Sequence, residues 1–207
     1  VHGYAESPWR AYCRSTRAHN TVRVNGGEQL ETWSVFRVGA RYSPRVEAWR
    51  EHADGHLLAA SHDAFAPFEH RRAVHYAEEG HWIVCDTVSG HGPWRAESYV
   101  HLHPDITAER VKEGYRLCGD FGEAALLLEG VDEACACRGE NNPQQGWYCP
   151  EFGTALPAET LVLRKHGEDT ARFGYALVPP GAAPPSRDTL RERLDELHAL
   201  KATEGAA

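Results

Sequence analysis

The chain passes from a basic loop into a β-strand within the stretch Tyr12-Cys-Arg-Ser-Thr-Arg-Ala-His-Asn-Thr-Val-Arg-Val-Asn-Gly26. The run from Thr21 to Val24 is rich in β-branched residues, and the asparagine and glycines that follow it predict a turn. His19 and Asn20 stand at the entrance of this strand. A strand entrance that combines arginines with an imidazole suits an anionic ligand, a metal ion, or both.

Short β-rich runs continue along most of the chain. Glycine, proline or asparagine, the residues that favour turns, separate each run from the next. We expect strands at residues 21–24, 32–38, 42–49, 57–61, 70–76, 81–88, 95–102, 107–110, 115–118, 124–129, 132–138, 160–165 and 171–178. The pair of runs between residues 72 and 86 is the clearest hairpin, with a Glu-Glu-Gly turn. About a dozen strands at this spacing predict an all-β fold, an antiparallel sandwich of two sheets.

The last part of the chain has a different composition. Residues 179–185 read Pro-Pro-Gly-Ala-Ala-Pro-Pro, which predicts a break or linker. Ser186 can cap a short C-terminal helix that runs to about Lys201, with leucines recurring on one helical face. We therefore expect a β-sandwich domain over residues 1–180, and a proline-rich linker with the helix over residues 181–207.

The charge of the chain is unevenly distributed. The 207 residues carry a formal net charge of −8, yet residues 1–50 hold eight arginines against four glutamates. An acidic protein is a poor nucleic-acid binder, and a basic first quarter suggests a local site for an anionic small molecule or glycan. The alternative is that these arginines are simply solvated. No apolar run reaches about 18 residues, so no membrane span is expected. The six cysteines form no CxxC pair and leave the compartment open.

The segment from Arg14 to Val22, with Gly26 and Gln29 after it, resembles the C-terminal β-sandwich domain of the heparinase II/III-like polysaccharide lyases. Weaker similarities follow in the same order at residues 33–39, 61–65, 70–71, 83–90, 101–104 and 146–153. Together they cover about residues 1–180. The resemblance implies that the chain is a piece of a longer protein. This piece is expected to begin after the N-terminal helical toroid of such enzymes. That toroid domain is the expected partner within the same protein.

The reaction implied by the resemblance is β-elimination on a uronate polysaccharide. A base removes the proton next to the uronate carboxyl group, and an acid protonates the leaving glycosidic oxygen. Glycosaminoglycan, alginate and bacterial exopolysaccharide all remain open as the acidic polysaccharide. The family's toroid provides most of the catalytic groups, so we expect no catalytic residue here and an inactive isolated chain. A periplasmic or secreted location is implied by the resemblance alone.

His19 matches the histidine that completes a metal site in those lyases. One imidazole cannot hold zinc, which takes three or four protein ligands, so the others are expected upstream of residue 1. The alternative is a strand-end histidine held by hydrogen bonds. His101 and His103, which share one strand face, could also chelate a metal, but they have no third ligand at a useful spacing.

Arg14 and Arg17 are candidate substrate-binding residues, because guanidinium groups bind carboxylates and sulfates in a bidentate way. The alternative is an ion pair within the domain, to Glu28 or Glu31. Asn20 is either a third substrate contact or a residue that fixes the turn. The rival to the whole hypothesis is a non-catalytic carbohydrate-binding or scaffold module, because the sandwich fold does not determine function.

Overall fold

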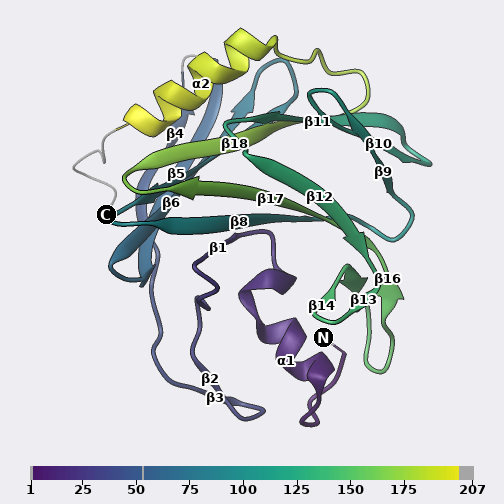
Figure 1. The fold of residues 1–207 in the computed structure, drawn as a ribbon. Helices are drawn as coiled ribbons and strands as arrows, with labels where there is room; N and C mark the ends of the chain where they lie inside the picture. The colour runs from purple at the N-terminus through teal and green to yellow at the C-terminus, as the bar shows by residue number, and fades with distance from the viewer. Residues whose placement is uncertain (1, 53, 201–207) are drawn as a thin grey trace.

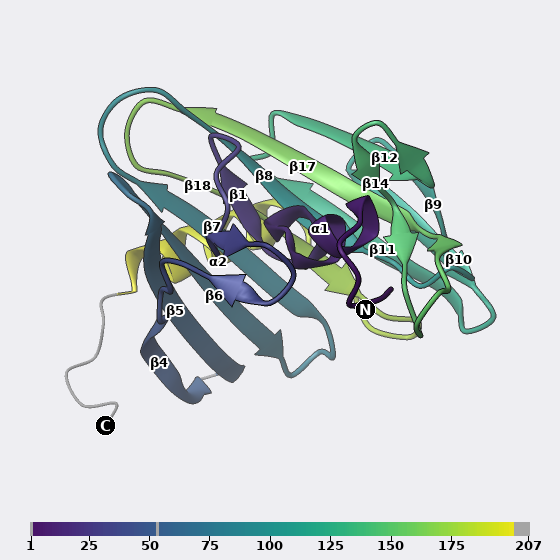
Figure 2. The ribbon, with the colours of Figure 1, turned by 90° about the horizontal axis from the view of Figure 1, so that it is seen from below.

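The computed structural model describes residues 2–52 and 54–200. Two antiparallel β-sheets face each other, and each carries a further segment on its outer side (Figure 1). The C-terminal helix, yellow in Figure 1, lies across the larger sheet. The N-terminal segment, purple, lies on the opposite side of the molecule, as the view from below also shows (Figure 2). In the described part of the chain, neither helix combines the length and apolar composition needed to span a membrane.

The larger sheet has eight strands in the order β4-β5-β6-β7-β18-β11-β10-β9, and all neighbours are antiparallel. The strand bounds are Arg45–His52 (β4), Gly55–Phe65 (β5), Phe68–Ala77 (β6), Trp82–Ser89 (β7), Ala171–Val178 (β18), Gly122–Glu129 (β11), Gly114–Gly119 (β10) and Thr107–Val111 (β9). The smaller sheet has four strands in the order β1-β8-β17-β12. Their bounds are Val22–Val24 (β1), Trp94–His101 (β8), Glu159–Gly167 (β17) and Glu133–Arg138 (β12).

Three two-stranded ribbons and three helical segments complete the fold. The ribbons pair Thr32–Trp33 (β2) with Arg37–Val38 (β3), Glu140–Asn141 (β13) with Gln144–Gln145 (β14), and Trp147–Tyr148 (β15) with Leu156–Pro157 (β16). The helical segments are α1 (Pro8–Arg14), the 3-10 turn η1 (Thr16–Ala18) and α2 (Arg187–Ala199). The ribbons lie outside the two main sheets.

Strand β7 is buried on both faces over most of its length, which explains the apolar run Trp82–Cys85 at its start. Alternate side chains of a strand point to opposite faces. Val84 and Val88 point inward, toward the smaller sheet, and belong to core clusters with residues of that sheet. Ile83 and Cys85 point outward and are covered by α2. An uninterrupted hydrophobic run is the pattern expected of a strand covered on both sides.

Helix α2 covers the outer face of the larger sheet. Ser186 caps it by accepting a hydrogen bond from the backbone N–H of Thr189 at 3.1 Å. Leu190, Leu194 and Leu197 are buried against a floor that includes several alanines of the sheet. Small floor residues let the helix approach closely, and each buried leucine contributes about 2 kcal/mol of hydrophobic stabilisation.

The predicted all-β sandwich with a C-terminal helix is confirmed, and the structure corrects it in detail. The run 32–38 is not one strand, because Ser34 adopts a positive φ of 50° and turns the chain between β2 and β3. The expected basic loop before β1 contains α1 and η1 instead. The helix ends at Ala199, and the expected extension to Lys201 lies outside the described residues. The division into domains at residue 180 stays a prediction.

Candidate functional site

The segment before β1 is fixed by local capping and by contacts to the turn after β1. Ser7 caps α1 by accepting from the backbone N–H of Arg10 at 3.1 Å, and proline occupies the first helical position. Thr16 then donates its backbone N–H to Glu28 at 2.5 Å, and its hydroxyl accepts from the N–H of Gln29 at 2.8 Å. The strand entrance that follows is therefore held in place from both sides.

His19 lies at the end of η1 with an extended backbone and an exposed side chain. Its backbone N–H donates to the carbonyl of Thr16 at 3.2 Å, and its imidazole makes no hydrogen bond to any other described residue. Within residues 2–52 and 54–200, no three His, Cys, Asp or Glu side chains are grouped so that they could hold a metal ion. The residues present thus supply one ligand and do not by themselves fit a zinc ion, which takes three or four.

Asn20 connects the strand entrance to two distant strands. Its side-chain oxygen accepts from the backbone N–H of His101, at the end of β8, at 2.7 Å. Its carbonyl oxygen accepts from Arg72 on β6 at 2.7 Å. Asn20 therefore joins the two sheets across their interface. The residue is nevertheless exposed to solvent.

Arg14 and Arg17 have different surroundings. The guanidinium of Arg14 donates to three backbone carbonyls of the ribbon β2–β3, those of Ser34, Val35 and Arg37, at 2.7–3.3 Å. The guanidinium of Arg17 makes no hydrogen bond or ion pair with any other described residue, and it borders a surface pocket between α1 and the turn after β1. Neither arginine pairs with Glu28 or Glu31, the partners considered from the sequence. Glu28 instead pairs with Arg23 at 3.1 Å.

His101 and His103 lie on one strand end but do not face a common ligand. The Nε2 of His101 donates to the carbonyl of Arg17 at 3.0 Å, and its Nδ1 accepts from the hydroxyl of Thr160 at 3.1 Å. Both ring nitrogens are thus used. Burial lowers the pKa of His101, which favours this neutral form, whereas the hydrogen bond to Arg17 opposes the shift. His103 is exposed and lies 3.3 Å from Asp105.

A chain of polar side chains leads from the strand entrance into the sandwich. The side-chain amide of Gln29 lies 3.1 Å from Nε2 of His62 on β5, and that nitrogen lies 3.2 Å from Nδ1 of His70 on β6. Nε2 of His70 donates to the carboxylate of Asp86 on β7 at 2.9 Å. We call His62, His70 and Asp86 the histidine relay. The cross-strand register, which places His62 opposite His70, brings the two imidazoles together.

Asp86 anchors the relay at its buried end. The carboxylate is fully buried and accepts two bonds from Arg72, at 2.7 and 2.8 Å, and one from Ser98 on β8 at 3.1 Å. Burial alone would raise the pKa of Asp86, but the charge and hydrogen bonds of Arg72, together with His70, hold it well below its usual range. A permanent carboxylate at this position fixes the Nε2–H tautomer of His70.

His62 forms the outer end of the relay. Its Nδ1 accepts from the backbone N–H of Ala64 at 3.3 Å, and its Nε2 lies between the Gln29 amide and Nδ1 of His70. Burial, and then the charge of His70, lower the pKa of His62 to about 4. His62 is therefore neutral at physiological pH. It does not carry a positive charge to an anion, and its two ring nitrogens already have partners within the domain.

His62 opens onto a surface pocket, which we call the His62 pocket. Its lining includes Thr21, Gln29, Tyr42, Pro44, His62 and Arg72. Tyr42 and Pro44 come from the connection that leads into β4. The strand entrance thus contributes to the same pocket as the histidine relay, and the pocket has both hydrogen-bonding and aromatic surfaces.

The same face of the larger sheet exposes aromatic side chains beyond this pocket. Trp49 on β4 is 78% exposed, and Tyr76 and Trp82, on β6 and β7, form an aromatic pair with centroids 4.5 Å apart. Register and alternation place all three on the inner face, with Trp49 opposite Leu58. The exposure of these side chains means that the smaller sheet does not cover this corner. Trp49's partner Leu58 is four residues from His62, about 13 Å along β5.

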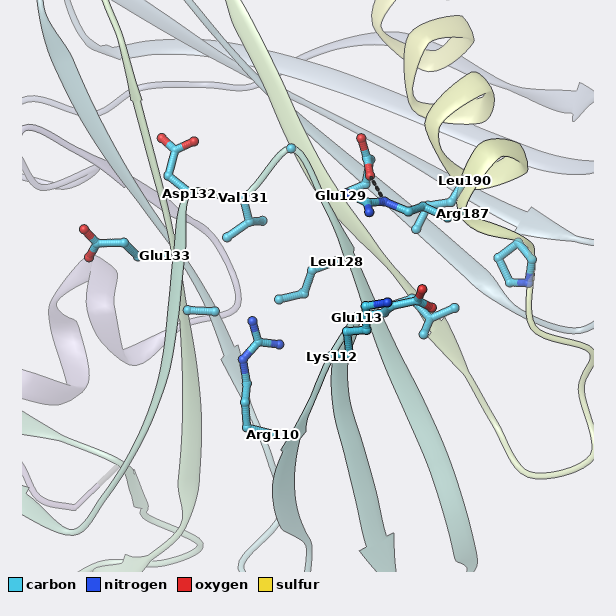
Figure 3. A pocket seen from close by; sticks show the side chains of 14 residues that line it. Arg110, Lys112, Glu113, Leu128, Glu129, Val131, Asp132, Glu133, Arg187 and Leu190 are labelled. Atoms are coloured by element: carbon cyan, nitrogen blue, oxygen red, sulfur yellow. Dashed lines mark hydrogen bonds and ion pairs between the residues drawn. The ribbon is translucent and has the colours of Figure 1, made fainter.

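Another pocket lies on a different part of the molecule, between β11, β12, the β9–β10 turn and the start of α2 (Figure 3). Its charged side chains include Arg110, Lys112, Glu113 and Glu129. Glu129 is buried and pairs with Arg187 at 3.5 Å, the contact drawn as a dashed line in Figure 3. Opposite charges balance each other there, and none of the four strand-entrance candidates His19, Asn20, Arg14 and Arg17 borders it.

The geometry is accompanied by similarity to known proteins. Residues 1–176 match the family model described as heparinase II/III-like, C-terminal. The fold is similar to that of heparan sulfate lyase HepC from Pedobacter heparinus, with a TM-score of 0.69, 16% identity, and coverage of 90% of this chain and 28% of that one. It is also similar to the heparinase III BT4657 gene product, with a TM-score of 0.67, 18% identity, and coverage of 86% of this chain and 27% of that one. No curated protein sequence matches the chain.

Proposed function

Because its first 176 residues match that family model, the chain belongs to the heparinase II/III-like C-terminal family, and we propose that it is the β-sandwich part of a uronate-polysaccharide lyase. It spans about a quarter of the length of the solved structures it matches. The reaction proposed for the complete polypeptide is β-elimination. The proton next to the uronate carboxyl group is removed, and the glycosidic oxygen leaves with a proton. Most groups that move these protons are assigned to the remainder of the polypeptide.

In this proposal the domain forms one wall of the substrate cleft. The His62 pocket and the exposed aromatic corner with Trp49, Tyr76 and Trp82 lie on one inner sheet face. Flat aromatic surfaces beside a few hydrogen-bonding groups are suited to sugar rings, which present apolar ring faces and hydroxyl edges. Contiguous exposed apolar patches often mark binding surfaces, whereas single exposed apolar side chains are common on any protein.

Arg17 is the arginine best placed to bind the acidic groups of the polymer. Its guanidinium is not engaged with any described acid or carbonyl, so its N–H groups are available to donate hydrogen bonds to a carboxylate or sulfate. Arg14 is a weaker candidate, because three backbone carbonyls already occupy its donors. Asn20 keeps its amide nitrogen for a substrate hydroxyl while its oxygen holds β8.

Within the pocket we assign His62 to contact with the polysaccharide, and His70 and Asp86 to positioning. The permanent carboxylate of Asp86 fixes His70, and Nδ1 of His70 lies 3.2 Å from Nε2 of His62. A fixed, neutral imidazole at the pocket edge offers its partly exposed ring to a sugar without attracting counter-ions. Phe65, which follows the same strand, carries no hydroxyl that could act as a proton donor there.

We further propose that His19 is one ligand of a zinc site whose other ligands come from elsewhere in the complete polypeptide. Its side chain is exposed and unengaged among the described residues, as a ligand that awaits partners would be. A metal there would brace the strand entrance against the neighbouring part of the protein.

The observation that carries the proposal is the family match over residues 1–176, joined to a polar chain that runs from the family's strand-entrance motif to a pocket. The test is to incubate the complete polypeptide with heparan sulfate, alginate and a uronate-containing exopolysaccharide, and with neutral dextran as control. Cleavage by β-elimination produces an unsaturated uronate that absorbs ultraviolet light. Absorbance should rise with at least one acidic polymer and not with dextran. If folded protein cleaves none but binds one, the domain belongs to a non-catalytic carbohydrate-binding module.

A further inference from the structure

Two cysteines that are far apart in the sequence lie next to each other in the structure. The Sγ atoms of Cys13, on α1, and Cys149, directly after β15, are 3.8 Å apart. Both side chains are partly exposed. Three of the remaining four cysteines have other partners: Cys85 is buried under α2, Cys135 lies 3.6 Å from Arg164, and Cys137 donates to the carbonyl of Thr160. The fourth, Cys118, is partly exposed on β10.

The two segments that carry this pair are packed together on either side of it. Trp9 on α1 contacts Trp147 on β15 edge-to-face, with centroids 5.0 Å apart. The backbone N–H of Gly153 donates to the carbonyl of His2 at 2.7 Å, and Tyr4 contacts Phe152 at a centroid distance of 4.8 Å. Contacts on both sides hold the two thiols at a nearly constant separation. A disulfide, with sulfur atoms about 2.05 Å apart, then requires less than about 2 Å of side-chain movement.

We propose that Cys13 and Cys149 form a redox-controlled disulfide that links α1 to the segment after β15. The oxidant is a disulfide compound, either a small molecule such as oxidised glutathione or a protein disulfide. One protein thiolate attacks a sulfur of the oxidant and releases one thiol, and the second protein thiol then displaces the other half. Two protein thiols become one disulfide, and the oxidant takes up the two electrons and two protons as two thiols.

The bond would have a structural consequence at the strand entrance. It closes a loop between two cysteines that are 136 positions apart in the sequence, and cross-linking a long loop restricts the unfolded chain strongly. Helix α1 continues directly into η1, which carries Arg17. The disulfide would therefore fix the segment that presents Arg17, while reduction would leave it held by non-covalent contacts alone. Burial, and then the neighbouring Cys13, raise the pKa of Cys149 to about 11, so exchange should proceed faster as the pH rises above neutral.

The test uses the complete polypeptide, equilibrated in a buffer of oxidised and reduced glutathione and then treated with an alkylating reagent. A peptide map without reduction should contain the Cys13 peptide joined to the Cys149 peptide. Reduction should separate the two peptides and lower the melting temperature, by about 5 °C or more. Cys13→Ser and Cys149→Ser should each abolish both effects. The matched control Cys118→Ser changes a partly exposed thiol on β10 and should preserve both.

Two results would overturn the proposal. One is a map in which Cys13 and Cys149 are both alkylated after oxidation. The other is a map in which either cysteine is joined to Cys135 or Cys137. The wild-type map decides the question even if a serine variant fails to fold.

Discussion

Arg72 and Asp86 lie directly opposite each other on β6 and β7, and the guanidinium binds both oxygens of the carboxylate, at 2.7 and 2.8 Å. The aspartate is fully buried, so this is a buried bidentate ion pair on the inner face of the larger sheet. Arg72 also donates to the carbonyl of Asn20, and Asp86 accepts from His70. One ion pair therefore joins the strand-entrance motif to the histidine relay.

The first prediction concerns this ion pair. Arg72→Met should lower the free energy of unfolding by about 3–5 kcal/mol, because it leaves Asp86 buried without its cation. Arg95→Met is the matched control. Arg95 is half exposed, and its ion pair with Glu97 is longer, at 3.4 Å. Its loss should therefore lower the free energy of unfolding by no more than about 1 kcal/mol. Urea unfolding at neutral pH measures both values. An equal decrease in the free energy of unfolding of the two variants would show that the buried ion pair stabilises the fold no more than the exposed one.

A second prediction follows from the lowered pKa of His62. An unfolded chain binds a proton at His62 as the pH falls through about 6.5, whereas the folded protein does so only near pH 4. Above pH 6.5 this group therefore leaves the free energy of unfolding unchanged. Between pH 6.5 and 4 that free energy decreases, by less than about 3 kcal/mol because solvent screens the partly exposed ring. His62→Gln should make the decrease smaller.

The pH dependence should be measured by urea unfolding at several pH values between 7 and 4. Burial also lowers the pKa values of His101 and His198, so the variant should keep part of the slope. His91→Gln, which alters a ring that is 99% exposed, should keep all of it. A His62→Gln profile that is parallel to the wild type would contradict the assignment of His62 as a partly buried, neutral histidine.

The third prediction separates the two arginines of the strand entrance. Arg14→Ala should lower the free energy of unfolding by about 1–3 kcal/mol, because three carbonyls of the β2–β3 ribbon lose their donor. Arg17→Ala should leave the melting temperature nearly unchanged and raise KM for an acidic polymer about tenfold. This increase should shrink at high salt, because the lost contact is ionic. A reversed pattern, with Arg14 affecting KM and Arg17 affecting stability, would refute the division.

The fourth prediction concerns His19 in the complete polypeptide. If His19 is a zinc ligand, His19→Ala should reduce the bound zinc and lower the melting temperature together, since metal binding is linked to folding. His91→Ala should leave both unchanged. Metal analysis of purified protein is the measurement. A wild-type protein without zinc, or a His19→Ala variant with its full complement, would identify His19 as an ordinary strand-end residue.

Most main-sheet strands could be predicted because turn residues separate them and because their side chains alternate or, as at the start of β7, form an apolar run. The break inside residues 32–38 could not, since the residue that turns the chain is Ser34, which rarely adopts a positive φ. Helix α1 carried a readable signal that was missed. Ser7 followed by Pro8 is a helix cap followed by a proline suited to the first turn.

The candidate site was predictable only in part. The strand-entrance motif identified His19, Asn20, Arg14 and Arg17, but not which of the two arginines is already engaged. The contact between His62 and His70 could have been predicted from the sequence, because a hairpin that turns between Phe65 and Phe68 places the two residues opposite each other. The proximity of Cys13 and Cys149 could not, since it depends on how the N-terminal segment packs against a ribbon far along the chain.

The connection between β1 and β4 has a consequence for how this domain can diversify. Part of the His62 pocket is built by residues 29–44, whose only regular structure is a ribbon of two-residue strands outside both main sheets. The apolar clusters that stabilise the sandwich draw their buried residues from other segments. Insertions or exchanges within residues 30–44 can therefore reshape the pocket while the hydrophobic core of the sandwich keeps its buried residues. Related chains are free to acquire new ligand preferences by changing this one connection.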